Sequence, residues 1–230
     1  MSVAVLLQLA DGRFPAGGHA HSGGTEPACG VGDVTDLASL RAYVDGRLAT
    51  TGRVDAAFAA YACRLAGGPP PVADDWRRLD DELAARTLSP AARRAGRTLG
   101  RQLLRAGGRV WPHPVLADVR AAVPDGVLQP VALGAVAAAA SLCPGDAAIC
   151  AVHHLLTGIT TAALRLLGLD PFEIARLHAD LAGRLDTIAG TAAEVAVAAA
   201  GPADLPADVG LLLDVLAEHH TSWDVRLFAS

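Results

Sequence analysis

Lysine is absent from the 230-residue sequence, so arginine supplies all 19 basic side chains. The absence excludes a P-loop lysine, a kinase-type phosphate-binding lysine and a lysine that forms a Schiff base with a substrate or with pyridoxal phosphate. The sequence also shows no Ser/His/Asp set and no G-x-S-x-G motif. No catalytic constellation is therefore predicted.

Aromatic residues are scarce, since Phe, Trp and Tyr together occupy only nine positions, while alanine occupies 49. Small side chains let helices approach closely, whereas sheets are built on β-branched and aromatic residues. With 52% apolar and 19% charged residues, the composition is that of a globular protein that needs neither disulfides nor a metal to hold its core. These features predict an all-α fold.

Four cysteines are spread along the chain without a C-x-x-C pair: Cys29, Cys63, Cys143 and Cys150. No signal peptide is visible, so we expect free thiols in a cytoplasmic protein. The most apolar stretch, 147–169, is interrupted by two histidines and an arginine. We interpret this stretch as a buried core helix and expect no membrane contact.

Helical spacing of apolar residues recurs along most of the chain. Asp36 and Ser89 are expected N-caps, and Asp170 begins a third capping pattern. The expected helices lie at 37–52, 54–66, around 76–83, from 90, and at 131–142, 146–168, 171–200 and 207–219, with an irregular segment at 110–130. The prediction is a single all-α domain over 1–230, a bundle of about eight to ten helices, with a glycine-rich loop at 11–24 and a docking tail at 222–230.

Charge is distributed unevenly along the chain. Residues 77–109 include nine arginines and only three carboxylates, whereas the rest of the chain holds ten arginines and 21 carboxylates. Four of these arginines recur every fourth residue and form one side of a predicted helix, here called the arginine ridge: Arg93, Arg97, Arg101 and Arg105. The ridge is either a solvated face or a docking surface for an acidic or phosphate-bearing partner. Nucleic acid is disfavoured by the net charge of −5 and the few aromatic residues.

Paired histidines and clustered acids suggest metal sites, but their spacing does not support one. His153 and His154 are adjacent, so on a helix they cannot grip the same ion. His19 and His21 could converge in the loop, yet two histidines without a third ligand bind weakly. The acidic residues around 74–82 lack the i, i+4 carboxylate pair of a magnesium diphosphate site, and we interpret them as a helix cap and an exposed face. We therefore expect no metal site and no cofactor.

Several short segments resemble a known family. Residues 6–11, 14–18 and 21–26 read LLQLAD, FPAGG and HSGGTE, which is similar to the opening signature of the UreF family of urease accessory proteins. Later segments resemble further motifs of that family in the same order: 100–105 (GRQLLR), 111–115 (WPHPV), 165–169 (RLLGL) and 226–230 (RLFAS). The sequence departs from the family pattern at 19–22, at 169–171 and at Ala229.

The resemblance implies an all-α, non-enzymatic protein that acts with two other accessory proteins, a UreH/UreD-like scaffold and the UreG GTPase, to deliver nickel into apo-urease. Nickel would then be handled by the complex and GTP by the partner. The family has also been proposed to modulate the GTPase. We also expect a homodimer.

Partner-binding residues are predicted in the family-like segments and on the arginine ridge: Gly18, His21, Ser22, Glu26, Arg97, Arg101, Arg105, Arg226, Leu227 and Phe228. The tail is too apolar for a free terminus, and we expect it to dock on the UreH-like partner rather than on its own domain.

Two other functions fit an all-α chain. A magnesium-dependent enzyme that processes diphosphates would turn over an allylic diphosphate, and a protein-interaction module of another family would bind different partners. A helical repressor is disfavoured because acidic residues outnumber arginines in the first 76 residues.

Overall fold

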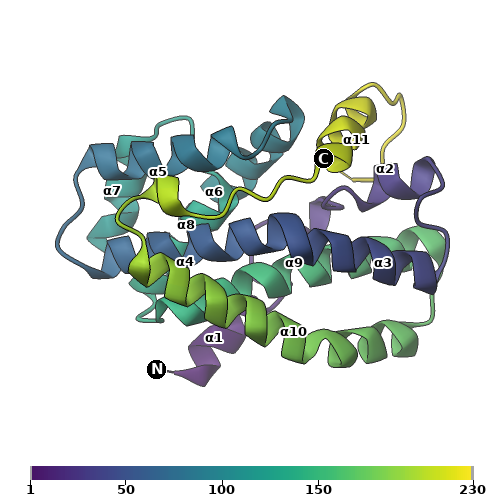
Figure 1. Cartoon of the computed structure of the whole chain (residues 1–230). Helices are drawn as coiled ribbons and strands as arrows, with labels where there is room; N and C mark the ends of the chain where they lie inside the picture. The colour runs from purple at the N-terminus through teal and green to yellow at the C-terminus, as the bar shows by residue number, and fades with distance from the viewer. Residues whose placement is uncertain (1, 229–230) are drawn as a thin grey trace.

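The computed structural model describes residues 2–228, apart from the side chain of His19, and these residues form helices without any strand (Figure 1). This confirms the all-α prediction. The helices are α1 (Val3–Ala10), α2 (Thr25–Gly30), α3 (Leu37–Arg47), α4 (Arg53–Gly67), α5 (Ala73–Ala85), α6 (Pro90–Val110), α7 (Pro114–Ala122), α8 (Gln129–Ala139), α9 (Pro144–Leu167), α10 (Pro171–Ala198) and α11 (Leu211–Thr221). Short helical turns lie at η1 (Gly18–Ala20), η2 (Leu48–Gly52) and η3 (Pro202–Asp204).

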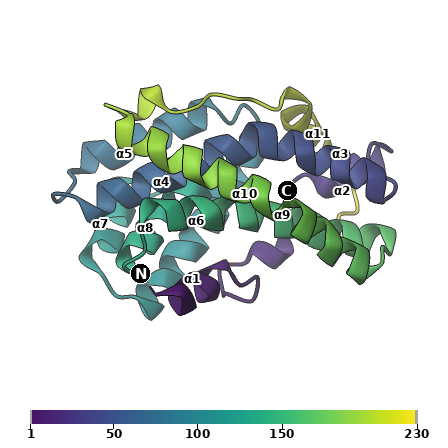
Figure 2. The same cartoon turned by 60° about the horizontal axis from the view of Figure 1, so that its bottom comes forward.

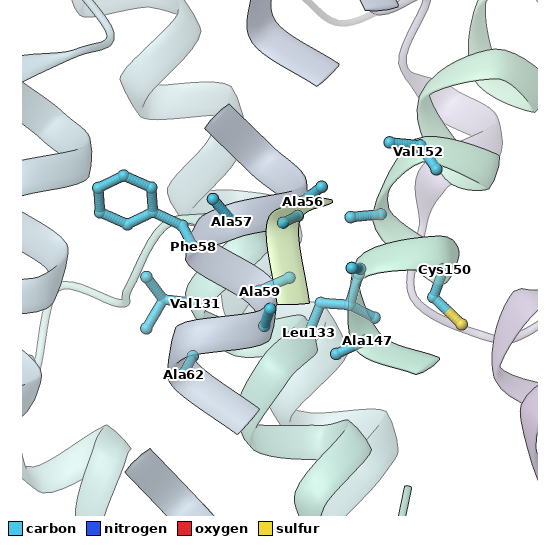
Figure 3. Packing of buried hydrophobic residues seen from close by; sticks show 14 of the residues in the cluster. Ala56, Ala57, Phe58, Ala59, Ala62, Val131, Leu133, Ala147, Cys150 and Val152 are labelled. Carbon is cyan, nitrogen blue, oxygen red and sulfur yellow. The ribbon is translucent and has the colours of Figure 1, made fainter. Parts of the chain in front are cut away.

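Helix α4 is the centre of the bundle and packs against α8, α9 and α10 (Figures 1 and 2). Five of its alanines, Ala56, Ala57, Ala59, Ala60 and Ala62, are fully buried. This alanine-rich part of α4 faces Val131 and Leu133 of α8 and Ala147 of α9 (Figure 3). The two backbones approach closely at Gly134 of α8, where an added Cβ would lie 2.2 Å from the carbonyl oxygen of Ala59. The abundance of small residues thus allows the backbones to approach closely.

The N-caps predicted from the sequence are confirmed. The Asp36 side chain accepts a hydrogen bond from the Ser39 amide at 2.8 Å, and the Asp170 side chain accepts one from the Phe172 amide at 2.8 Å. The Ser89 hydroxyl accepts one from the Ala92 amide at 3.0 Å, with Pro90 at the first helical position. Each cap satisfies an amide that has no partner inside its own helix.

Some expected boundaries were wrong. The segment 110–130 is not irregular throughout, because α7 occupies Pro114–Ala122 and His113 caps it through Nδ1 at 3.3 Å from the Val115 amide. The two helices expected on either side of Gly52 are joined by the π-helical turn η2. A π turn keeps the chain helical while shifting its phase, so the glycine does not end the helix.

Helix α9 is the one helix within residues 2–228 that is long and apolar enough to cross a membrane by length and composition. More than half of the most apolar 18-residue stretch of α9 is buried inside the protein. Burial against protein is what a core helix requires, and this agrees with the interpretation of 147–169 made from the sequence.

Candidate partner-binding surfaces

The glycine-rich loop 11–24 lies on α6. Gly17 has a φ of +78°, and a Cβ at this position would lie 1.7 Å from Oε1 of Gln102, so the loop needs glycine here both for its backbone and for space. The ring of Phe14 stacks on Trp111 with 5.5 Å between centroids. The structure therefore brings the loop into contact with 100–105 and 111–115, two distant segments that also resemble the family.

The end of the loop leads into α2. Gly18 begins the turn η1, where its carbonyl accepts a hydrogen bond from the His21 amide at 3.1 Å. Ser22 is fully buried, and its hydroxyl has no hydrogen-bond partner within the described residues. Arg47 of α3 donates to the Gly23 carbonyl and, at 3.1 Å, to the hydroxyl of Tyr43. Gly18 therefore helps to shape the loop, and Ser22 lies buried where the loop meets α2.

A cavity of about 230 Å³ lies beside this loop, between α4, α6 and α11. Its lining includes His21, Arg47, Asp55, Arg86 and Asp214. Burial raises the pKa of Asp55 to about 6, and the Arg47 guanidinium opposes that rise. His21, a predicted binding residue, is therefore placed at a mostly apolar cavity that also contains several charged side chains.

The arginine ridge does not form one continuous docking surface. Arg97 forms an ion pair at 2.6 Å with Asp80, whose side chain is 2% exposed, and it also donates to the Gly126 carbonyl. Arg101 donates to the Asp125 carbonyl at 2.6 Å and remains exposed. Arg105 is exposed and makes no hydrogen bond or ion pair within residues 2–228. Arg97 thus stabilises the fold through contacts within the chain. Arg101 and Arg105 are exposed and accessible to a partner.

Glu26 of α2 holds the C-terminal tail. Its Oε1 accepts a hydrogen bond from the Leu227 amide at 2.7 Å, and its Oε2 accepts one from the Phe228 amide at 3.0 Å. The buried His220 of α11 lies 3.1 Å from the same Oε2. Burial lowers the pKa of His220, while the Glu26 carboxylate opposes that shift. Glu26 is thus a carboxylate that organises the tail of its own chain.

The expectation that the tail docks on a partner rather than on its own domain was wrong for two of its aromatic residues. Phe228 is only 7% exposed, with Arg165 of α9 over its ring. Trp223 packs over Gly30, where an added Cβ would lie 2.1 Å from the indole ring. By contrast, Leu227 is 74% exposed, and Arg226 is also exposed. Residues 229 and 230 of the predicted docking tail lie outside the described residues.

Removal of residues 222–230 is therefore expected to destabilise the isolated protein. Loss of the buried Phe228 and the packed Trp223 should lower the free energy of unfolding by about 2–3 kcal/mol, which corresponds to a melting temperature lower by about 5–10 °C. Differential scanning fluorimetry would measure the shift. Leu227→Ser, at an exposed position, is the control and should melt like the unmodified protein. An unchanged melting temperature after truncation would contradict a stabilising role of the tail and would favour a role in partner binding alone.

Within residues 2–228, no group of three or more His, Cys, Asp or Glu side chains is arranged to hold a metal ion. The backbone of His19 and His21 lies in or next to η1, but the side chain of His19 is outside the described residues. His154 instead contacts the Leu9 carbonyl at 3.0 Å, and burial lowers its pKa to about 4. His154 therefore links α9 to α1 as a neutral side chain.

Three of the acidic residues at 74–82 make contacts within their own chain. Asp74 pairs with Arg77 at 2.9 Å, and Asp75 accepts a hydrogen bond from the Val72 amide at 2.9 Å. Asp80 accepts one from the Leu128 amide at 2.7 Å. The sequence interpretation of this cluster as a helix cap and an exposed face holds for Asp74 and Asp75 but was wrong for the buried Asp80.

Comparison with known proteins relates this arrangement to one family. The family model named UreF matches residues 34–182. The chain is 46% identical over 230 residues to a urease accessory protein UreF of Mycobacterium sp. (strain JLS), with 100% of this chain and 99% of the relative covered. The chain belongs to the UreF family. Proteins with the same name from Mycolicibacterium vanbaalenii and Mycobacterium tuberculosis are 42% and 41% identical over 229 residues, with the same coverage.

Membership of the UreF family confirms the resemblance found in the short segments. The family model stops short of both the glycine-rich loop and the tail, whereas the full-length relatives cover both. Two contacts were missed from the sequence: Glu26 with the tail amides, and Arg97 with Asp80 inside the matched region. In both cases the sequence shows a charged residue but no pattern that points to its partner.

Proposed function

We propose that this protein acts in urease maturation as a non-enzymatic scaffold. It joins a UreH/UreD-like accessory protein and the UreG GTPase so that nickel reaches apo-urease, and it modulates the GTPase. In this proposal the chain works in the cytoplasm as a homodimer. It carries no cofactor of its own, because nickel is handled by the complex and GTP by the partner.

The observation that carries the proposal is the full-length relationship to urease accessory proteins of the UreF family. The chemistry of the described residues is compatible with it. Asp74, Asp75 and Asp80, three of the acidic residues considered for a magnesium diphosphate site, instead contact Arg77, Arg97 and backbone amides. No contact among the described residues favours the diphosphate enzyme, so a function in binding other proteins is the better-supported hypothesis.

Two kinds of exposed surface suit protein partners. Arg101 and Arg105 present guanidinium groups on α6, which can bind carboxylates of an acidic partner. Leu211, Leu212 and Val215 on α11 are each more than 60% exposed. Exposed apolar side chains gathered on one helix are typical of protein interfaces.

The decisive experiment is co-purification with the other products of a urease operon. A double variant, Arg101→Glu with Arg105→Glu, should lose co-elution with the accessory complex and lower urease activation in nickel-supplied cells, because charge reversal repels an acidic surface. Arg97 stays unchanged because it holds Asp80.

Arg176→Glu, at an exposed arginine of α10, is the matched control and should co-elute normally. If the unmodified protein fails to co-purify with any urease accessory protein, the scaffold role is wrong. If the double variant co-elutes as the unmodified protein does, the arginines are only a solvated face.

A further inference from the structure

Two cysteines from distant parts of the chain meet where α4 passes the turn between α8 and α9. The thiol of Cys63 on α4 donates a hydrogen bond to the Leu142 carbonyl at 3.4 Å. That carbonyl belongs to the peptide unit that ends at the Cα of Cys143, about 3 Å away in standard geometry. The Cys63 sulfur therefore lies within one peptide unit of the Cys143 backbone, although 79 residues separate it from Leu142.

The two thiols differ in exposure, which gives them different roles. Cys143 is exposed at the start of α9, whereas Cys63 is 2% exposed. Burial raises the pKa of the Cys63 thiol to about 12, with smaller contributions from Cys143 and Asp146. An oxidant in solution therefore meets Cys143 first, and Cys63 is the buried thiol that can resolve the product.

The turn that carries Cys143 contains a strained residue. Ser141 has a φ of +59° and is the one residue other than glycine with a positive φ within residues 2–228. A side chain in this left-handed region costs free energy, so a modest rearrangement of 141–143 can release strain as the sulfurs approach. Bridging two cysteines requires their Cα atoms to lie within roughly 7 Å.

We propose that Cys63 and Cys143 form an oxidative modification site, at which a peroxide converts the two thiols into a disulfide that ties α4 to the α8–α9 turn. The Cys143 thiolate attacks one peroxide oxygen, the O–O bond breaks, and Cys143 becomes a sulfenic acid while hydroxide leaves. The Cys63 sulfur then attacks the Cys143 sulfur. The S–O bond breaks, and the departing hydroxide takes the Cys63 proton as water. Overall, two thiols are oxidised and hydrogen peroxide is reduced to two water molecules.

The other cysteines supply internal controls. Cys150 is fully buried on α9, and Figure 3 shows its sulfur directed away from α4. Its pKa is raised to about 12 by burial and by Asp146, with no contribution from Cys63. Cys29 is half-buried on α2. Neither is expected to join the bridge.

Peptide mapping tests the proposal on the full-length protein. The protein is treated with hydrogen peroxide, free thiols are alkylated, and trypsin is added. Cleavage after arginine places Cys63 in the peptide 54–64 and Cys143 in 121–165, which also contains Cys150. We expect the two peptides to appear linked, two hydrogen atoms lighter than their sum, in the unmodified protein and in Cys150→Ser. The linked species should be absent from Cys143→Ser and from Cys63→Ser.

A second measurement guards against misfolding of the Cys63 variant. Oxidation should raise the melting temperature of the unmodified protein and of Cys150→Ser, because the bridge restricts the unfolded chain. It should leave the exposed-site variant Cys143→Ser unchanged. A linked peptide that persists in Cys143→Ser would overturn the pairing. Peroxide treatment that yields only singly oxidised Cys143, or only disulfides between two molecules, would overturn the proposal as a whole.

Discussion

Gly134→Ala is expected to lower the free energy of unfolding by about 3 kcal/mol, at the upper end of what overpacking costs. The new Cβ would lie 2.2 Å from the Ala59 carbonyl oxygen and 2.8 Å from the Cys63 amide nitrogen. Both atoms belong to the backbone of α4, so no side chain can rotate away to make room. Helices α4 and α8 would have to separate at the centre of the core. Urea unfolding followed by far-ultraviolet circular dichroism would measure the loss.

Gly190→Ala on α10 is the matched control for this substitution. No heavy atom lies within 4 Å of the Cβ that it adds. Alanine is favoured over glycine inside a helix, so a gain of about 0.5–1 kcal/mol is expected. A Gly134→Ala protein as stable as the unmodified one would mean that the α4–α8 contact is looser than the structure shows.

Arg97→Ala is expected to cost about 3 kcal/mol, because it leaves the Asp80 carboxylate buried without its positive partner. Burial already raises the pKa of Asp80, and the Leu128 amide and Arg97 oppose that rise. Without Arg97 the pKa should rise further. An acidic group whose pKa is higher in the folded than in the unfolded chain destabilises the fold at pH values above its pKa in the unfolded chain. The loss of stability in Arg97→Ala should therefore be largest at neutral pH and shrink as the pH falls toward 4.

Two companion variants isolate the cause. Asp80→Asn removes the buried charge and should recover much of the stability lost in Arg97→Ala when the two are combined, which a double-mutant cycle would measure. Arg101→Ala breaks contacts at an exposed site and should cost less than about 1 kcal/mol. If Arg97→Ala and Arg101→Ala lower the free energy of unfolding equally, the ion pair between Arg97 and Asp80 contributes no more than an exposed contact.

The arginine ridge was predicted only in part from the sequence. Four-residue spacing correctly placed the arginines on one helix, because helical periodicity is a local property. It could not show that α5 brings Asp80 under Arg97 while Arg105 stays exposed. A pair separated by 17 residues depends on how two helices pack, and side-chain spacing along one helix carries no information on that.

Sequence alone was enough to predict the all-α class, the capped starts of α3, α6 and α10, and the resemblance to the UreF family. Each of these depends on composition, on local hydrogen bonding by a cap residue or on ordered short segments. Three contacts became visible only in the folded chain: Gly17 fits against Gln102, Glu26 binds the tail amides, and Cys63 faces the Leu142 carbonyl. These contacts join segments far apart in the chain, and their geometry is set by the close approach of helices around α4, which no local pattern encodes.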